Sequence, residues 1–440
     1  SPEVPVNTLS GGNQQKVVIA RVLMDEPAVV LADEPSQGVD AGARLEIYQI
    51  LRAAADEGRV VIIASADAIE LQGLCDRVLV FSRGRVVRDI EGQDLTEHTI
   101  THAALTATTL RSRQAGGKVA SRLGRFLRGD FAPGVVLVLA MLLLAAYVAS
   151  VNPFYLTERN FGNVLTLVTA LSFVVLGQLT VMLTAGIDLS VGPLTGFAVV
   201  VASFFILDDV GPLWIAAGFG AALLVALLVG ALNFALIWTV GIVPVVATLS
   251  TFMALRGLSL FLREIPGGLI NTSVTEAIGA RIGFVPVAFL LVVLAALAME
   301  WATRRTRWGL SLRAVGSHAA NAGRIGIPVR AVLFSAYALS ALFASLGAAM
   351  LMAQIGIGDP TAGIDYTMMS VTAVVLGGAS LFGGRGSYVG ALLGALLVQQ
   401  VFNVTTFLRL APAWQYLLLG ILTIGAVTLY SHFRRRISQP

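Results

Sequence analysis

The chain has 440 residues, of which 56% are hydrophobic and only 13% are charged, and its mean hydropathy is +0.81. Soluble domains carry roughly 25% charged residues, so lipid rather than water must surround much of this chain. The formal net charge of +4 does not point to a nucleic-acid partner, because the basic residues flank apolar stretches as in cytoplasmic loops.

Charged residues are concentrated at the front of the chain. Residues 1–130 carry frequent acidic and basic side chains, whereas residues 131–431 are a succession of apolar blocks. This shift near Phe131 predicts a soluble part followed by a membrane part. The single cysteine, Cys75, excludes an intrachain disulfide. Of the scattered histidines, His98 and His102 have helical i,i+4 spacing, but the acidic context of a metal site is missing.

The first motif is Leu-Ser-Gly-Gly-Asn-Gln-Gln-Lys at residues 9–16, followed by an apolar periodic stretch at 17–24. Small residues before a helix leave its first backbone N–H groups open to an anion. Ser10 adds a hydroxyl donor, and Gly11 and Gly12 would let a phosphate come close to the backbone. An ordinary capped helix after a glycine turn would show the same pattern.

A short apolar run at 28–32 predicts a buried parallel strand, and it ends in Asp33 and Glu34. Two carboxylates at the end of a strand suit one metal ligand and one residue that orients water for phosphoryl transfer. Further along, a helix is expected at about 43–56, with strands at 60–64 and about 76–81. This alternation predicts an α/β domain.

The order and spacing of these elements resemble the nucleotide-binding domain of the ABC transporter family. Residues 9–16 look like its signature motif, the strand with Asp33 and Glu34 like its Walker B strand, and Gly38-Val39-Asp40 like its D-loop. The resemblance is especially close to the second half of the tandem ATPases that drive monosaccharide importers. It implies that Asp33 binds Mg²⁺ and Glu34 is catalytic. It also implies a set of ATP contacts: Leu9, Ser10, Gly11, Gly12, Asn13, Gln14 and Asp40.

Two departures from the family pattern matter. The phosphate-binding loop G-x-x-x-x-G-K-[ST] is not found in this sequence and is expected upstream. Ala66 stands where the switch histidine is expected, a loss common in the second half of the tandem sugar ATPases. We therefore assign residues 1–105 to a partial nucleotide-binding domain. ATP and Mg²⁺ are expected in the complete transporter, and this chain alone is expected to bind neither, so its status as an enzyme depends on the complete protein.

Residues 106–130 are polar and basic, and residues 131–440 form the membrane domain. The basic stretch reads as a cytoplasmic linker ending in a helix that lies on the membrane surface; a disordered basic tether fits equally well. The rest predicts a mainly α-helical bundle of about ten spans, each near the roughly 20 residues that cross hydrocarbon. They are placed at 133–151, 161–183, 190–207, 212–239, 243–262, 284–303, 331–354, 367–383, 387–406 and 413–431.

Arginine placement orients the bundle. Six arginines between residues 304 and 330 place that loop in the cytoplasm, which also brings both chain ends to the cytoplasmic side. The same loop is long and rich in Ala and Gly, so it suits a short helix that docks on an ATPase; a plain solvated loop is the alternative. The candidate coupling residues are Arg313, Gly316, Ala319 and Gly326.

Polar residues inside the spans are candidates for a transport pathway. Asp188, in Gly-Ile-Asp-Leu-Ser-Val-Gly at 186–192, must be paired or solvated so near hydrocarbon; it could equally cap a helix. The other candidates could instead hydrogen-bond between helices. They are Gln178, Asn233, Gln399 and Asn403.

Most of residues 131–431 resembles the permeases of the ribose, xylose and galactose importers. The motif GIDLSVG at 186–192 is the most specific part of this resemblance. The resemblance implies a compact bundle of the type II importer kind in the bacterial inner (plasma) membrane, surrounded by lipid. It also implies three partners: a second permease copy, a tandem ATPase or the remaining ATPase half, and an extracytoplasmic sugar-binding protein. The expected function is ATP-driven import of a monosaccharide.

Three alternatives stay open. The cargo could be another small polar solute, such as a nucleoside, an autoinducer or a branched-chain amino acid. The ATPase-first order also fits an ABC exporter, although the number of spans and the short outer loops argue against it. Finally, an ATP-independent transporter could carry an inert ATPase remnant.

Overall fold

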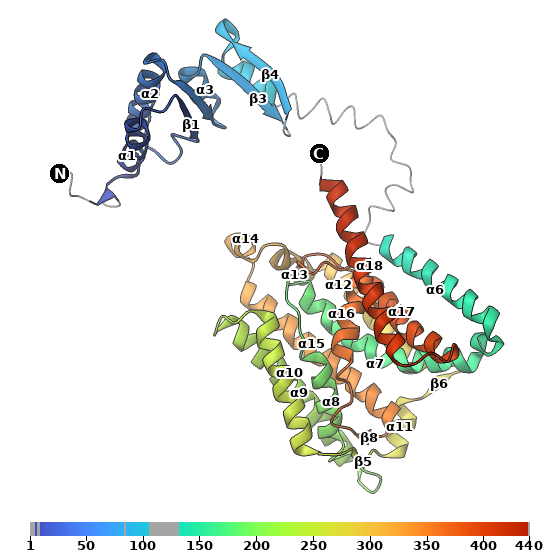
Figure 1. Cartoon of the computed structure of the whole chain (residues 1–440). Coiled ribbons are helices and arrows are strands. Elements are labelled where there is room, and N and C mark those ends of the chain that lie inside the picture. The colour runs from blue at the N-terminus through green and yellow to red at the C-terminus, as the bar shows by residue number, and fades with distance from the viewer. Residues whose placement is uncertain (1–4, 7–8, 83–84, 105–131, 439–440) are drawn as a thin grey trace. The chain divides into compact units, whose positions relative to one another are not determined.

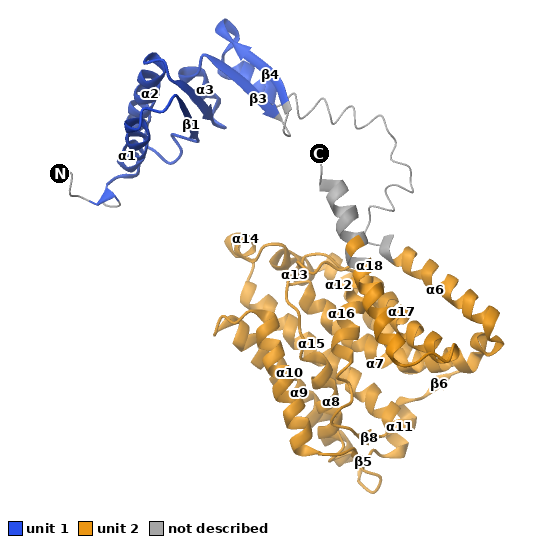
Figure 2. Cartoon of the chain, in the orientation of Figure 1, with its two compact units in different colours: residues 1–121, 440 blue, residues 122–439 orange. Residues whose placement is uncertain are grey.

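The computed structural model describes residues 5–6, 9–82, 85–104 and 132–438. The chain divides into two compact units, residues 1–121 and residues 122–439, shown in blue and orange in Figure 2. The linker predicted at 106–130, and with it both predicted domain boundaries, lies outside the described residues.

Unit 1 is an α/β domain. Its elements are α1 (Gly11–Met24), β1 (Val29–Asp33), α2 (Ala41–Asp56), β2 (Val60–Ala64), α3 (Ala68–Leu74), β3 (Arg77–Ser82), β4 (Arg85–Glu91) and the short η2 (Gly92–Asp94). β1 and β2 are parallel, with Val30 opposite Val61, and β3 and β4 are antiparallel. Helix α2 starts two residues before the predicted position because Asp40 caps it.

Unit 2 is a bundle of apolar helices, which confirms the predicted fold class (Figure 1). Its long helices and their neighbours are α6 (Ala132–Val151), α7 (Glu158–Met182), α8 (Val191–Ala202), α9 (Pro212–Trp238), α10 (Pro244–Leu262), α12 (Val287–Arg305), α15 (Val329–Ile355), α16 (Tyr366–Leu376), α17 (Tyr388–Phe407) and α18 (Ala413–Ser438). A helix lies at each of the predicted spans. Within the described residues, seven helices are long and apolar enough to cross a membrane.

Two predicted spans are wrong in length. Helix α8 has 12 residues and α16 has 11, so at about 1.5 Å per residue each covers little more than half of the roughly 30 Å of hydrocarbon. Helix α8 is almost wholly buried and α16 is partly buried within the bundle, where irregular backbone can find partners. The predicted spans 190–207 and 367–383 are therefore half-helices with extended or turn segments at their ends.

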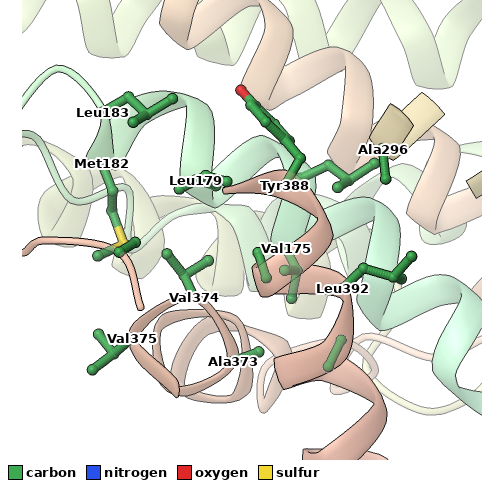
Figure 3. Close-up of a cluster of buried hydrophobic side chains, with 14 of the residues drawn as sticks. Val175, Leu179, Met182, Leu183, Ala296, Ala373, Val374, Val375, Tyr388 and Leu392 are labelled. Carbon is green, nitrogen blue, oxygen red and sulfur yellow. The ribbon is translucent and has the colours of Figure 1, made fainter. Parts of the chain in front are cut away.

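Helix α7 is the centre of unit 2. Every residue from Val168 to Met182 is buried. In Figure 3 its side chains meet those of three other helices: Ala296 of α12, Val374 of α16, and Tyr388 of α17. A helix that is apolar all round and buried is stabilised by packing on every side, so α7 positions the elements around it.

The short elements lie between the helices. They are η3 (Pro153–Leu156), β5 (Gly267–Leu269), α11 (Thr272–Ile278), β6 (Arg281–Ile282), β7 (Val285–Pro286), α13 (Arg307–Ser317), α14 (Ala319–Arg324) and β8 (Ile357–Gly358). β5 pairs with β8 and β6 with β7. The arginine-rich loop thus holds two short helices, where one was predicted; they are separated by His318, which caps α14.

An internal repeat underlies this arrangement. The order long helix, short helix, long helix occurs twice, in α7–α8–α9 and in α15–α16–α17. An identical stretch, Thr-Ala-Gly-Ile-Asp, precedes each short helix, at 184–188 and at 361–365. Helices α7 and α15 run in opposite directions, because Gly177 of α7 faces Ser340 of α15, while Gly347, later in α15, faces Ala170, earlier in α7. The two halves are therefore inverted relative to each other.

Candidate functional site

In unit 1 the signature segment at the start of α1 packs against the D-loop at the start of α2. A Cβ atom at Gly12 would lie 2.5 Å from the Ala43 Cβ and 3.1 Å from the Val39 side chain, so only glycine lets α1 sit this close to α2. Asp40 Oδ1 accepts hydrogen bonds from the backbone N–H groups of Gly42 (3.1 Å) and Ala43 (3.0 Å). The Ala43 bond is the main reason why the pKa of the Asp40 carboxyl lies below its usual value.

At the start of α1, the Ser10 hydroxyl and the space around Gly11 are free of contacts within the helix. Ser10 is the exposed N-cap residue, and its hydroxyl makes no capping bond to the helix. A Cβ at Gly11 would meet nothing closer than the Gly38 carbonyl oxygen at 3.9 Å. The Gln14 side chain donates to the Leu9 carbonyl at 2.7 Å and closes the turn, while Asn13 is exposed. These residues fit a phosphate contact at a helix N-terminus.

The two carboxylates after β1 differ in their surroundings. Asp33 is exposed at the end of the strand. Glu34 has a left-handed backbone (φ 47°), and its Oε1 accepts a hydrogen bond of 2.9 Å from the backbone N–H of Ala66. The residue at the switch position therefore holds Glu34 through its backbone. Among the described residues no group of three or more potential ligands surrounds Asp33, so a Mg²⁺ site there stays a prediction.

The candidate coupling residues divide between the inside and the outside of unit 2. A Cβ at Gly316 would lie 1.8 Å from the Leu183 carbonyl oxygen, and Arg313 Nη2 donates to the Gly386 carbonyl at 2.8 Å. Both residues hold α13 against the bundle. Ala319, by contrast, is exposed at the start of α14, and Gly326 adopts φ 87° where the chain turns after α14.

Glu300, which the sequence analysis missed, fastens this region to α17. It is only 8% exposed, near the end of α12. Its carboxylate accepts from the Ser387 hydroxyl (3.0 Å) and the Tyr388 backbone N–H (2.6 Å), and it pairs with Arg304. The ion pair and the hydrogen bonds together offset the cost of burying this carboxylate.

Asp188 is buried at the turn between α7 and α8, which we call the α7–α8 corner (residues 183–190). It is 3% exposed. Its Oδ1 accepts from the Ser190 backbone N–H (3.0 Å) and hydroxyl (2.6 Å), and its Oδ2 accepts from the Ser340 hydroxyl (3.1 Å). The carboxylate thus joins the corner to α15 through neutral donors.

Hydrogen bonds extend from Asp188 to two further helices. Asn233 of α9 donates to the Ser190 hydroxyl at 2.8 Å, and its carbonyl oxygen accepts from Thr251 of α10 at 2.7 Å. Thr248 of α10 accepts from the Leu189 backbone N–H at 3.1 Å. We call Asp188, Ser190, Asn233, Thr251 and Ser340 the Asp188 network. It is a polar centre where helices from both halves of the repeat meet.

The remaining pathway candidates have different surroundings. Asn403 exchanges two hydrogen bonds with Asn160 of α7, of 2.8 and 3.3 Å, so it ties α17 to α7. Gln399 is half-buried. Gln178 is fully buried, and neither its amide nitrogen nor its oxygen has a hydrogen-bond partner among the described residues. Gln178 is therefore the candidate with unused hydrogen-bonding capacity.

Comparison with known proteins gives two matches within the chain. Residues 160–427 match the family described as "Branched-chain amino acid transport system / permease component", and residues 2–37 match the family described as "ABC transporter". The chain belongs to this permease family.

Two relatives of the permease support the match over most of their length. The ribose import permease protein RbsC of Escherichia coli (strain K12) is 31% identical over 298 residues, which is 66% of this chain and 91% of the relative. The autoinducer 2 import system permease protein LsrC of Yersinia pestis (strain Pestoides F) is 30% identical over 305 residues, 68% of this chain and 84% of the relative. The predicted resemblance to import permeases of ABC systems is confirmed.

The permease match covers the Asp188 network, α13, α14 and Glu300, whereas the ABC transporter match covers the signature and both carboxylates but ends before Asp40. One signal in the permease sequence could have revealed the half-helices. The repeated stretch Thr-Ala-Gly-Ile-Asp marks the start of both half-helices, and half-helices near the middle of a transporter point to its binding region.

Proposed function

We propose that this permease imports a monosaccharide across the bacterial inner membrane in an ATP-driven transporter. The observation that carries the proposal is the Asp188 network, found in a chain whose relatives include a ribose import permease. Sugar hydroxyls both donate and accept hydrogen bonds. A buried carboxylate with neighbouring amides offers acceptors and donors to such a solute.

In this proposal Asp188, Asn233 and Gln178 contact the solute during transport. The Gln178 amide has both hydrogen-bonding atoms unused, which is costly for a buried polar group unless another state satisfies it. Gln399 and Asn403 would lie along the same pathway. For Asn403 this requires its bonds with Asn160 to break, so its role is the more demanding one.

The arginines of α13 and α14 support a cytoplasmic position for that face and for both chain ends. The exposed surface of α14 would then dock on an ATPase, as the coupling prediction requires. A tandem ATPase or the remaining ATPase half, a second permease copy and an extracytoplasmic sugar-binding protein would complete the transporter. Ser10, Gly11 and the first N–H groups of α1 would contact a phosphate of ATP, and Asp33 would bind Mg²⁺. ATP supplies the energy of the conformational cycle.

Uptake by the complete transporter in proteoliposomes tests the cargo. We expect ATP-dependent accumulation of labelled ribose or another monosaccharide, competed by unlabelled sugar. The name of the LsrC relative makes autoinducer 2 the second candidate. Accumulation of autoinducer 2 or of leucine alone would contradict the monosaccharide assignment. Uptake without ATP, or transport in the opposite direction, would contradict ATP-driven import.

A bulky substitution tests the coupling role of α14. Ala319→Trp changes an exposed residue at the start of this helix and should lower the sugar moved per ATP several-fold while hydrolysis persists. Ser273→Trp, on the exposed surface of α11, is the matched control. Equal ratios for the two variants would show that α14 is not the coupling element.

A further inference from the structure

The loop between α16 and α17 carries a compact turn at residues 380–385, which we call the Phe382 turn. The Ser380 backbone N–H donates to the Arg385 carbonyl at 3.0 Å, and the Gly383 N–H donates back to the Ser380 carbonyl at 3.2 Å. The Phe382 N–H donates to the Ser380 hydroxyl at 3.2 Å. Gly383 and Gly384 have φ of 82° and 72°, a conformation that favours glycine. These bonds hold the tip in one conformation.

Phe382 stands at the tip of this turn. Its side chain is 78% exposed, and Arg385 in the same turn is exposed as well. An exposed arginine beside the tip does not suit the lipid interior. An exposed aromatic residue with a neighbouring arginine is the composition found at the centre of protein–protein interfaces.

The turn is fastened to α13, the first of the two short helices in the arginine-rich loop. A Cβ at Gly383 would lie 2.6 Å from the Gly316 carbonyl oxygen, and a Cβ at Gly384 would lie 2.4 Å from the Ser317 hydroxyl oxygen. Arg313 of α13 donates to the Gly386 carbonyl at the end of the loop. The Phe382 turn therefore lies directly against α13, on the face that carries the arginines.

The turn is also fastened to the α7–α8 corner. The Gly384 N–H donates to the Leu183 carbonyl at 3.0 Å, and a Cβ at Gly383 would lie 2.7 Å from the Ala185 Cβ. Ala185 itself has φ 64°, so the corner is held in a conformation that alanine rarely adopts. Three residues later comes Asp188. A force applied at the turn would reach the Asp188 network through backbone contacts alone.

We propose that Phe382 is a second point of contact between the permease and its ATPase, inserting into an apolar hollow on the ATPase surface beside the contact made by α14. The inference rests on the proposed function, since it places the ATPase on the α13–α14 face. It gives the Phe382 turn the task of passing movement of the ATPase to the α7–α8 corner, while α14 passes it to α15.

Photo-cross-linking in the assembled transporter identifies the occupant. With p-benzoylphenylalanine at position 382, we expect adducts that contain ATPase peptides. The matched control is the same group at Phe154 of η3, which is 73% exposed and should give no ATPase adduct. Adducts at 382 with lipid only, or with a second permease copy only, would overturn the proposal.

A substitution measures the consequence. Phe382→Ser removes an exposed side chain, so folding should be unaffected, yet sugar moved per ATP hydrolysed should fall several-fold; Phe154→Ser should leave the ratio unchanged. Equal ratios for the two variants would overturn the coupling role. These outcomes can be distinguished from those of the cargo test. Sugar uptake without an ATPase adduct would contradict only this inference, and an adduct without sugar uptake would contradict only the cargo assignment.

Discussion

The two copies of Thr-Ala-Gly-Ile-Asp have the same sequence and different surroundings. Asp188, in the first copy, is 3% exposed and accepts three hydrogen bonds. Asp365, in the second, is exposed and accepts from the Tyr416 hydroxyl at 3.3 Å. The threonines differ as well: Thr184 is buried, whereas Thr361 bonds at the surface to Asp359. Five identical residues therefore do not determine whether their carboxylate becomes a structural centre.

What the second copy contributes is backbone packing. A Cβ at Gly196 of α8 would lie 2.0 Å from the Ala362 carbonyl oxygen, and one at Gly192 would lie 2.7 Å from the Gly363 carbonyl oxygen. The second copy thus lies directly against the half-helix that follows the first copy. One copy supplies a buried carboxyl group, and the other supplies the surface that encloses its neighbourhood.

The largest difference between the copies is expected for the two aspartates. Asp188→Asn replaces one carboxylate oxygen by an NH₂ group, although all three bonds to this side chain come from donors, two of Ser190 and one of Ser340. Leaving a buried polar group unsatisfied costs about 1–3 kcal/mol. Asp365→Asn changes an exposed side chain and should cost less than about 0.5 kcal/mol. Thermal unfolding of both variants in detergent measures this. Equal shifts in Tm would mean that the burial of Asp188 has no energetic consequence.

A second comparison concerns the two glycines of the repeat. Gly363 has φ 79°, and a Cβ there would lie 2.9 Å from the Gly192 carbonyl oxygen. Gly363→Ala should destabilise by about 1–2 kcal/mol from the left-handed backbone alone. At Gly186 the backbone is not left-handed, and the nearest atoms belong to side chains, the Tyr337 hydroxyl oxygen at 2.9 Å and a Val181 methyl carbon at 3.0 Å. Gly186→Ala should therefore cost less, and the reverse order of unfolding midpoints would contradict this account.

Ser340 gives a smaller effect that sharpens the role of Asp188. Ser340→Ala removes one of three hydrogen bonds to the carboxylate and should cost about 1 kcal/mol. In the Asp188→Asn background the same change should cost much less, because the effects of substitutions on stability are not additive within one hydrogen-bond network. A double-mutant cycle on unfolding midpoints measures the coupling; full additivity would show that the 3.1 Å bond contributes nothing.

The smallest effect is expected at the partner of Asp365. Tyr416→Phe removes an exposed hydrogen bond of 3.3 Å and should change the free energy of unfolding by less than about 0.5 kcal/mol. A loss comparable to that of Ser340→Ala would show that the second copy also holds a polar centre, and would remove the contrast between the copies.

Much of the fold could be predicted from the sequence, because helices in lipid must be long and apolar. The half-helices could not, since hydropathy does not distinguish an apolar helix from an apolar turn. Phe204 and Ile206 continue the apolar run after α8 has ended at Ala202. In unit 1 the parallel strand that ends at Asp33 was predicted correctly, but its predicted burial is wrong, because Val30 is the one buried residue of β1. The capping of α2 by Asp40 explains why that helix starts early.

The surroundings of the candidate site could be predicted less well. That Asp188 needs a partner followed from its position near hydrocarbon, but the partner Ser340 is 152 residues away, and a neutral serine inside an apolar helix gives no sequence signal. Asn403 and Asn233 looked alike as polar residues in spans. Only the packing shows that one is tied to Asn160 and the other to the Asp188 network.

The bond between Asn160 and Asn403 has a consequence for how the protein is made. The two residues are 243 positions apart, and a ribosome adds about 5–20 residues per second, so α17 follows α7 by on the order of 10–50 s. During that interval Asn160 can keep only its local bond to the Tyr155 carbonyl. Helix α7, most of which is buried in the finished bundle, is thus made well before α17, one of the helices that later pack against it.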